Sequence, residues 1–121
     1  MSFTIKQEEY FIRVDLNKGF SSVDLASVVM ASGELESLSE MTPNKLVVIN
    51  IKVLDLRFDD LFPQAKFRES IDFASEFKTA IVVNNEVNFG TARIWQSIMN
   101  STKASIEIFR SEAEAMEWLQ Q

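Results

Sequence analysis

The chain opens with an alternation of apolar and polar side chains in the stretch "SFTIKQEEYFIRVDLNKGF". Phe3 and Ile5 repeat at every second position, and a second series with the same period runs from Tyr10 to Leu16. The polar residues "QEE" separate the two series. Two alternating runs joined by a short polar stretch predict an antiparallel β-hairpin with one buried face.

Three later runs also have the character of strands. "NKLVVINIKVL" and "FKTAIVVNN" are almost continuously apolar and rich in Val and Ile. Such runs are typical of central strands that are covered on both faces. The third run, "ASIEIFR", alternates again and predicts one more strand.

Helical spacing of apolar residues marks two segments between these strands. The first begins at Ser21 or Ser22, either of which can cap it, and ends before Pro43. Its apolar residues are Leu25, Val28, Val29, Leu35 and Leu38. The second spans about residues 63–77 and has a broad apolar arc formed by Phe67, Ile71, Phe73, Ala74 and Phe77.

Two more helices are predicted towards the end of the chain. One covers about residues 87–100, and its apolar line consists of Val87, Thr91, Ile94 and Ile98 with Trp95 alongside. The other begins at Ser111, which forms a capping box with Glu114. Ala115, Trp118 and Leu119 share one face of this last helix, which we expect to cover the sheet.

The predicted order of elements is therefore β-β-α-β-α-β-α-β-α. Strands that alternate with helices predict an α/β fold with a largely parallel sheet, to which the first strand is joined antiparallel through its hairpin. With 121 residues, only 3 Gly and 2 Pro, the chain is expected to form a single domain over residues 1–121.

Composition narrows the range of functions. The formal net charge of −6 and the lack of a Lys/Arg cluster argue against a nucleic-acid partner. The sequence holds no Cys and no His, so that thiolate catalysis, Ser-His catalysis and zinc sites of the usual type are excluded. No apolar run is long enough for membrane insertion, and no signal peptide is recognisable, which predicts a cytoplasmic protein.

Three motifs resemble a known family. They are the strand "TAIVVNN" followed by a helix, the strand end "IEIFRS", and the closing "EAEAMEWL". Together with the order of elements, they resemble the STAS domains (sulfate transporter and anti-sigma-factor antagonist), in the SpoIIAA-like branch of small, stand-alone bacterial proteins. The resemblance implies a sheet backed by helices and a role in binding without catalysis. It also implies a regulatory serine after the third strand, yet "VLDLRFDDLFP" contains no Ser or Thr between Val53 and Pro63.

Polar side chains gather after the third and fourth predicted strands. Asp55, Asp59 and Asp60 follow the third, and Asn84, Asn85 and Asn88 follow the fourth. Ligands of open α/β sheets bind outside the carboxyl ends of the strands, so the two loops are expected to face one crevice. These oxygens suit Mg²⁺ or Ca²⁺, but caps and turns favour the same residue types, and we expect the latter role and no metal or other cofactor.

Phe73 and Phe77 suggest a second kind of binding face. A broad aromatic arc can line an apolar pocket, although such arcs more often pack against protein, either in the core or in a homodimer. The sequence therefore predicts a non-catalytic domain that binds a protein partner. The alternatives are a carrier or sensor of a small apolar or nucleotide ligand and, third, a metal-dependent carboxylate enzyme using Asp55 and Asp59.

Overall fold

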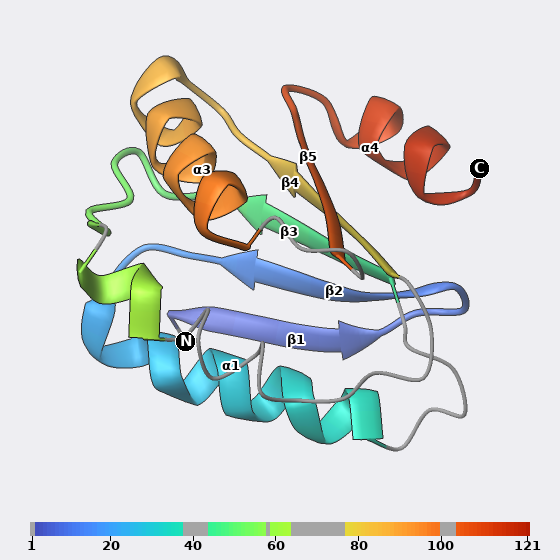
Figure 1. Ribbon diagram of the computed structural model, residues 1–121, viewed down its shortest axis with the longest axis horizontal. Helices are drawn as coiled ribbons and strands as arrows, with labels where there is room; N and C mark the ends of the chain where they lie inside the picture. The colour runs from blue at the N-terminus through green and yellow to red at the C-terminus, as the bar shows by residue number, and fades with distance from the viewer. Residues whose placement is uncertain (1, 38–43, 58, 64–76, 100–103) are drawn as a thin grey trace.

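The computed structural model describes residues 2–37, 44–57, 59–63, 77–99 and 104–121. Strands and helices alternate along the chain in the predicted order, as an α/β fold (Figure 1). A short helical segment at 59–63 lies between the third and fourth strands. The other elements are β1 (Phe3–Gln7), β2 (Phe11–Leu16), α1 (Ser22–Ser37), β3 (Asn44–Ile49), β4 (Phe77–Val82), α3 (Glu86–Met99), β5 (Ala104–Phe109) and α4 (Glu112–Leu119).

The five strands form one mixed sheet in which spatial order equals chain order, β1-β2-β3-β4-β5. β1 pairs antiparallel with β2, and all other neighbours are parallel. Each parallel connection therefore advances by one strand in the same direction. Because such crossovers are right-handed, their helices fall on one face of the sheet.

The larger core lies on that face, between the sheet and helices α1 and α3. Strand β2 contributes Ile12, Val14 and Leu16, the inward set of its alternating pattern, and each is at most 7% exposed. Helix α1 adds Leu25, Val28 and Val29 as predicted. Tyr10 belongs to the same alternating series but lies in the hairpin turn and is exposed. The buried face of β2 therefore begins at Ile12 and not at Tyr10.

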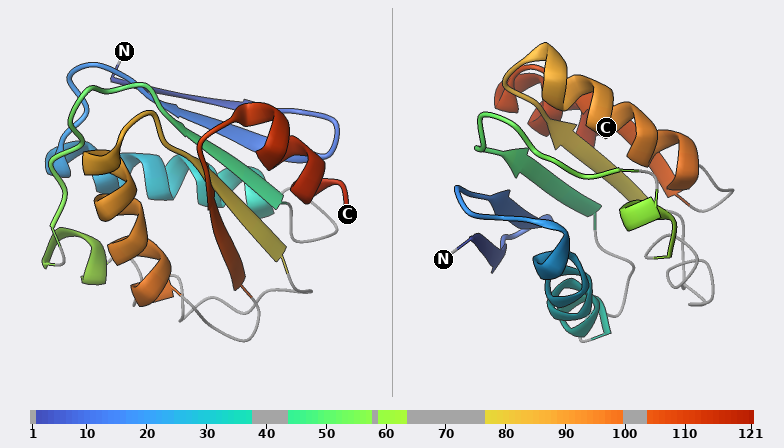
Figure 2. Two further views of the ribbon diagram at one scale, coloured as in Figure 1. Left: turned by 90° about the horizontal axis from the view of Figure 1, so that it is seen from above. Right: turned by 90° about the vertical axis from the view of Figure 1, so that its left-hand side faces the viewer.

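Helix α4 covers the opposite face and completes a second, smaller core (Figure 2). Its Ala115 and Leu119 pack on the outward residues of β3 and β4, which are Leu46, Val48, Ala80 and Val82. The predicted cap is present, because the Ser111 hydroxyl accepts from the Glu114 amide at 3.4 Å. Trp118 is only half-buried and stacks at a tilt on Phe109, so the seal is made chiefly by Leu119.

Two sequence expectations need correction. Phe77, predicted at the end of a helix, is the first residue of β4 and is buried. In α3, Val87 and Ile94 belong to the predicted apolar line but are both exposed, because the helix turns Asn88 and Ala92 inward instead. Phe73 lies outside the described residues, as does most of the helix predicted for 63–77. No helix within the described ranges is both long and apolar enough to cross a membrane.

Candidate functional site

Asparagine side chains join the loops that follow β3 and β4. Asn84 Nδ2 donates to the main-chain oxygen of Ile51 at 3.1 Å, and Asn85 Nδ2 donates to that of Lys52 at 2.7 Å. Residues 84–88 and 51–54 are thereby held side by side at the carboxyl edge of the sheet. The two loops are therefore adjacent, while the crevice that they were predicted to face stays a prediction.

Asn88 is the centre of this junction and is completely buried. Its Oδ1 accepts from the Leu54 amide at 2.8 Å, and its Nδ2 donates to Ile51 O at 2.8 Å and to Asn84 Oδ1 at 2.7 Å. Asn85 in turn caps α3, since its Oδ1 accepts from the Asn88 amide at 2.9 Å. The three asparagines thus hold main chain and one another, which is the cap-and-turn role, and their amides do not converge on an open crevice.

The aspartates of the same region lie further out. Asp55 and Asp59 are exposed, whereas Asp60 Oδ2 accepts from the Arg57 amide at 3.0 Å, as a residue in the first turn of a helix does. Over the described parts of the chain, no group of three acidic side chains is arranged to hold a metal ion. Asp55 therefore places an exposed carboxylate directly after the joined loop, and Asp59 is exposed at the start of the short helical segment at 59–63.

Two exposed valines flank this junction, and the sequence reasoning did not single them out as surface residues. Val53 lies between the bonded residues Lys52 and Leu54 and is 54% exposed. Val87 lies between Asn85 and Asn88 and is 58% exposed. The exposure of Val53 could not be predicted, because Val53 falls inside the apolar run "NKLVVINIKVL", which predicts a buried strand.

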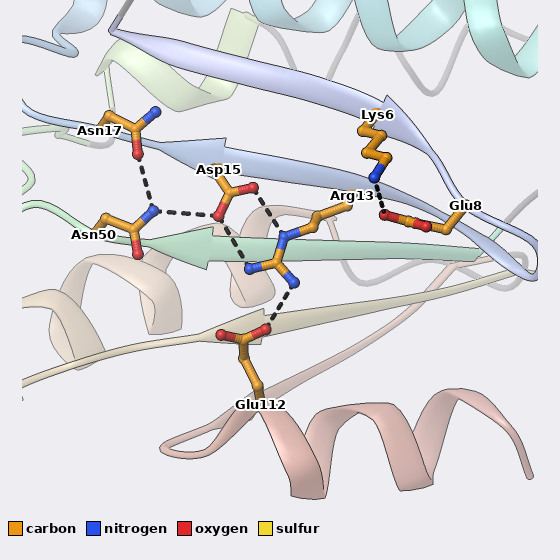
Figure 3. A network of polar contacts seen from close by, with 7 residues as sticks. All are labelled: Lys6, Glu8, Arg13, Asp15, Asn17, Asn50 and Glu112. Atoms are coloured by element: carbon orange, nitrogen blue, oxygen red, sulfur yellow. Dashed lines mark hydrogen bonds and ion pairs between the residues drawn. The ribbon is translucent and has the colours of Figure 1, made fainter.

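A network of charged side chains occupies the part of the outer sheet face that α4 leaves open (Figure 3). Arg13 donates to both oxygens of Asp15, at 2.9 and 3.2 Å, and to Glu112 of α4 at 2.7 Å. Asn50 Nδ2 bridges to Asp15 at 3.2 Å and to Asn17 at 2.9 Å. This network ties the first turn of α4 to β2.

The network shifts the ionisation of its two central members. Burial by itself would raise the pKa of Asp15, but the hydrogen bonds from Arg13 and Asn50 outweigh it and hold that pKa below its ordinary value. The hydrogen bonds to Asp15 and Glu112 raise the pKa of Arg13. The sequence shows that Arg13 and Asp15 lie two positions apart on one face of a strand, which predicts their ion pair. It does not indicate that Glu112 of α4 joins them.

A cavity of about 120 Å³ lies on the other face of the sheet, among α1, α3 and the strands. Its lining is apolar over most of its extent and includes Phe77, which was predicted as a pocket residue, and Trp95. The polar exceptions are Lys45, Thr79 and Thr91. Lys45 and Thr79 are 8% and 7% exposed and face each other in the β3-β4 register.

Comparison with known proteins adds nothing to this geometry. No family model, no curated protein and no solved structure matches the chain.

Proposed function

We propose that this protein is a non-catalytic binding domain that engages a protein partner through an edge surface formed by Val53, Asp55, Asp59 and Val87. The observation that carries the proposal is the junction of the two loops. Side-chain amides fix residues 51–54 against 84–88 with hydrogen bonds of 2.7 to 3.1 Å, and the exposed valines stand on those fixed segments. A surface that is already ordered loses little conformational entropy when a partner docks.

The chemistry of the edge surface favours binding over catalysis. The amides that would orient a substrate are occupied by main-chain groups. What the surface offers outward is two apolar side chains beside carboxylates, which is the composition of a small protein interface with a polar rim. An acidic rim of this kind suits a partner with Lys or Arg around an apolar contact.

The resemblance to the SpoIIAA-like domains supports the same site by analogy. In partner-switching members a serine lies just after the third strand, and its phosphorylation controls binding to the partner. Here Asp55 and Asp59 place permanent negative charge in that loop. Binding is therefore expected to be constitutive, without control by a kinase and a phosphatase.

The test places a photo-crosslinking amino acid at position 53 or 87 of the full chain in its own host. Val23 is the matched control, because it is also a valine, is 83% exposed, and lies on α1, outside the two joined loops. We expect one discrete crosslinked product from positions 53 and 87 and none from position 23. A product of twice the mass of the chain would identify the partner as a second copy.

Charge provides the second arm of the test. Asp55→Asn together with Asp59→Asn should reduce crosslinking from position 87 by about tenfold, because rim charges change the rate of association. Equal crosslinking from positions 23, 53 and 87 would refute the proposed surface. A discrete product that is indifferent to the two aspartates would refute the role of the acidic rim.

A further inference from the structure

We infer that the cavity between the sheet and helices α1 and α3 is a binding site for a small apolar carboxylate, with Lys45 and Thr79 holding the carboxylate. The polar end of this cavity lies away from the edge surface, because Lys45 and Thr79 lie near the amino ends of β3 and β4. Nothing in the proposed partner binding requires it.

The first argument is the burial of a cation in an apolar wall. Lys45 is 8% exposed, and its neighbour on β2 is Ile12, which is 1% exposed. An ammonium group in such surroundings is costly unless anionic or polar groups compensate for it. Lys45 takes part in an interaction within the chain, but an ammonium has three donors and can hold a further acceptor.

The second argument is the hydroxyl beside it. Thr79 faces Lys45 across the β3-β4 pair and is 7% exposed, and it lines the same cavity. Because neighbouring strands are about 4.8 Å apart, one carboxylate can accept from both side chains.

The third argument is the shape and lining of the remaining space. Away from the polar pair, the cavity is bounded by apolar side chains of both helices and of four strands, among them Val14, Val28, Trp95 and Ile106. An apolar cavity of about 150 Å³ in another protein stays dry and binds benzene. A space of about 120 Å³ therefore suits a short aliphatic chain or a ring. The ligand class that combines both ends is a short carboxylic acid of up to about six carbons.

The chain contains its own reporter for the test. Of its 2 Trp, Trp95 lines the cavity and Trp118 lies on the opposite face of the sheet. In a Trp118→Phe background, the fluorescence of Trp95 can be followed while hexanoate is added, with hexanol as the uncharged probe of equal chain length. We expect a saturable change with hexanoate and binding of hexanol about 10- to 100-fold weaker, the range for hydrogen bonds to a charged group.

Variants assign the effect to the polar pair. Lys45→Met should weaken the binding of hexanoate by the same factor and leave the binding of hexanol unchanged. The matched control Lys52→Met lies on the exposed loop after β3 and should change neither affinity. Thr79→Val should weaken hexanoate by about tenfold or less. No saturable response, equal affinity for acid and alcohol, or full affinity in Lys45→Met would each overturn the inference. If Lys45→Met does not fold, the comparison of acid with alcohol in the unchanged cavity decides.

Discussion

Replacing Asn88 by alanine should destabilise the protein more than the same change at Asn84 or Asn85. The side chain is fully buried and makes three hydrogen bonds. Removing it orphans the amide of Leu54, itself only 4% exposed, which costs about 1–3 kcal/mol. Ile51 O keeps its bond from Asn84, so that group adds little. With the small void left behind, the free energy of unfolding should fall by about 2–4 kcal/mol.

Urea denaturation at neutral pH measures this loss, with an unchanged m-value as the sign that the native state stays compact. Asn88→Asp is the informative companion, because a carboxylate keeps the acceptor for Leu54 but presents no donor to Ile51 O or Asn84 Oδ1. It should cost at least as much as alanine. Asn50→Ala, at an exposed position, should cost less than about 1 kcal/mol. A loss below about 1 kcal/mol in Asn88→Ala, or a stable Asn88→Asp, would refute the view that this side chain holds the loop.

Three other predictions concern stability. Leu119→Ala should cost about 2–4 kcal/mol and exceed Trp118→Ala in the same urea titration, since Leu119 is buried and Trp118 half-buried. Gly90→Ala should raise the melting temperature by stabilising α3 by about 0.5–1 kcal/mol, because an added Cβ meets no atom within 4 Å. Because the pKa of Asp15 is lower in the folded than in the unfolded chain, ionised Asp15 stabilises the fold at pH values above the unfolded-state pKa. That stabilisation is lost as the pH falls through the lower pKa of the folded state. An acid titration of stability should therefore be shallower below pH of about 4 in Asp15→Asn.

The fold was predictable because its signals are local. Alternation in β2 and continuous apolar runs in β3 and β4 reflect how many faces of each strand are covered, and the structure places those strands accordingly. The cap at Ser111 was equally legible, because it depends on residues three apart. For this order of elements, the rule that parallel strands are joined by right-handed crossovers allows only a few sheet topologies.

The candidate site was less predictable because its geometry is set by contacts distant in the chain. That Asn84, Asn85 and Asn88 follow a strand was visible, but the carbonyls that they hold belong to residues more than thirty positions earlier. The spacing of apolar residues also did not predict which face of α3 is buried. An apolar line through Val87 and Ile94 predicts burial, yet the fully satisfied Asn88 replaces an apolar residue at the centre of the buried face.

The placement of α4 has a consequence for how the protein is made. Every strand of the sheet leaves the ribosome before residues 112–119, so the outer face of β3 and β4 has no cover of its own during that interval. Leu46, Val48, Ala80 and Val82 are then the apolar surface of a nascent chain that is otherwise able to close its larger core. Folding of α4 onto the sheet is thus the step that removes this apolar surface from water.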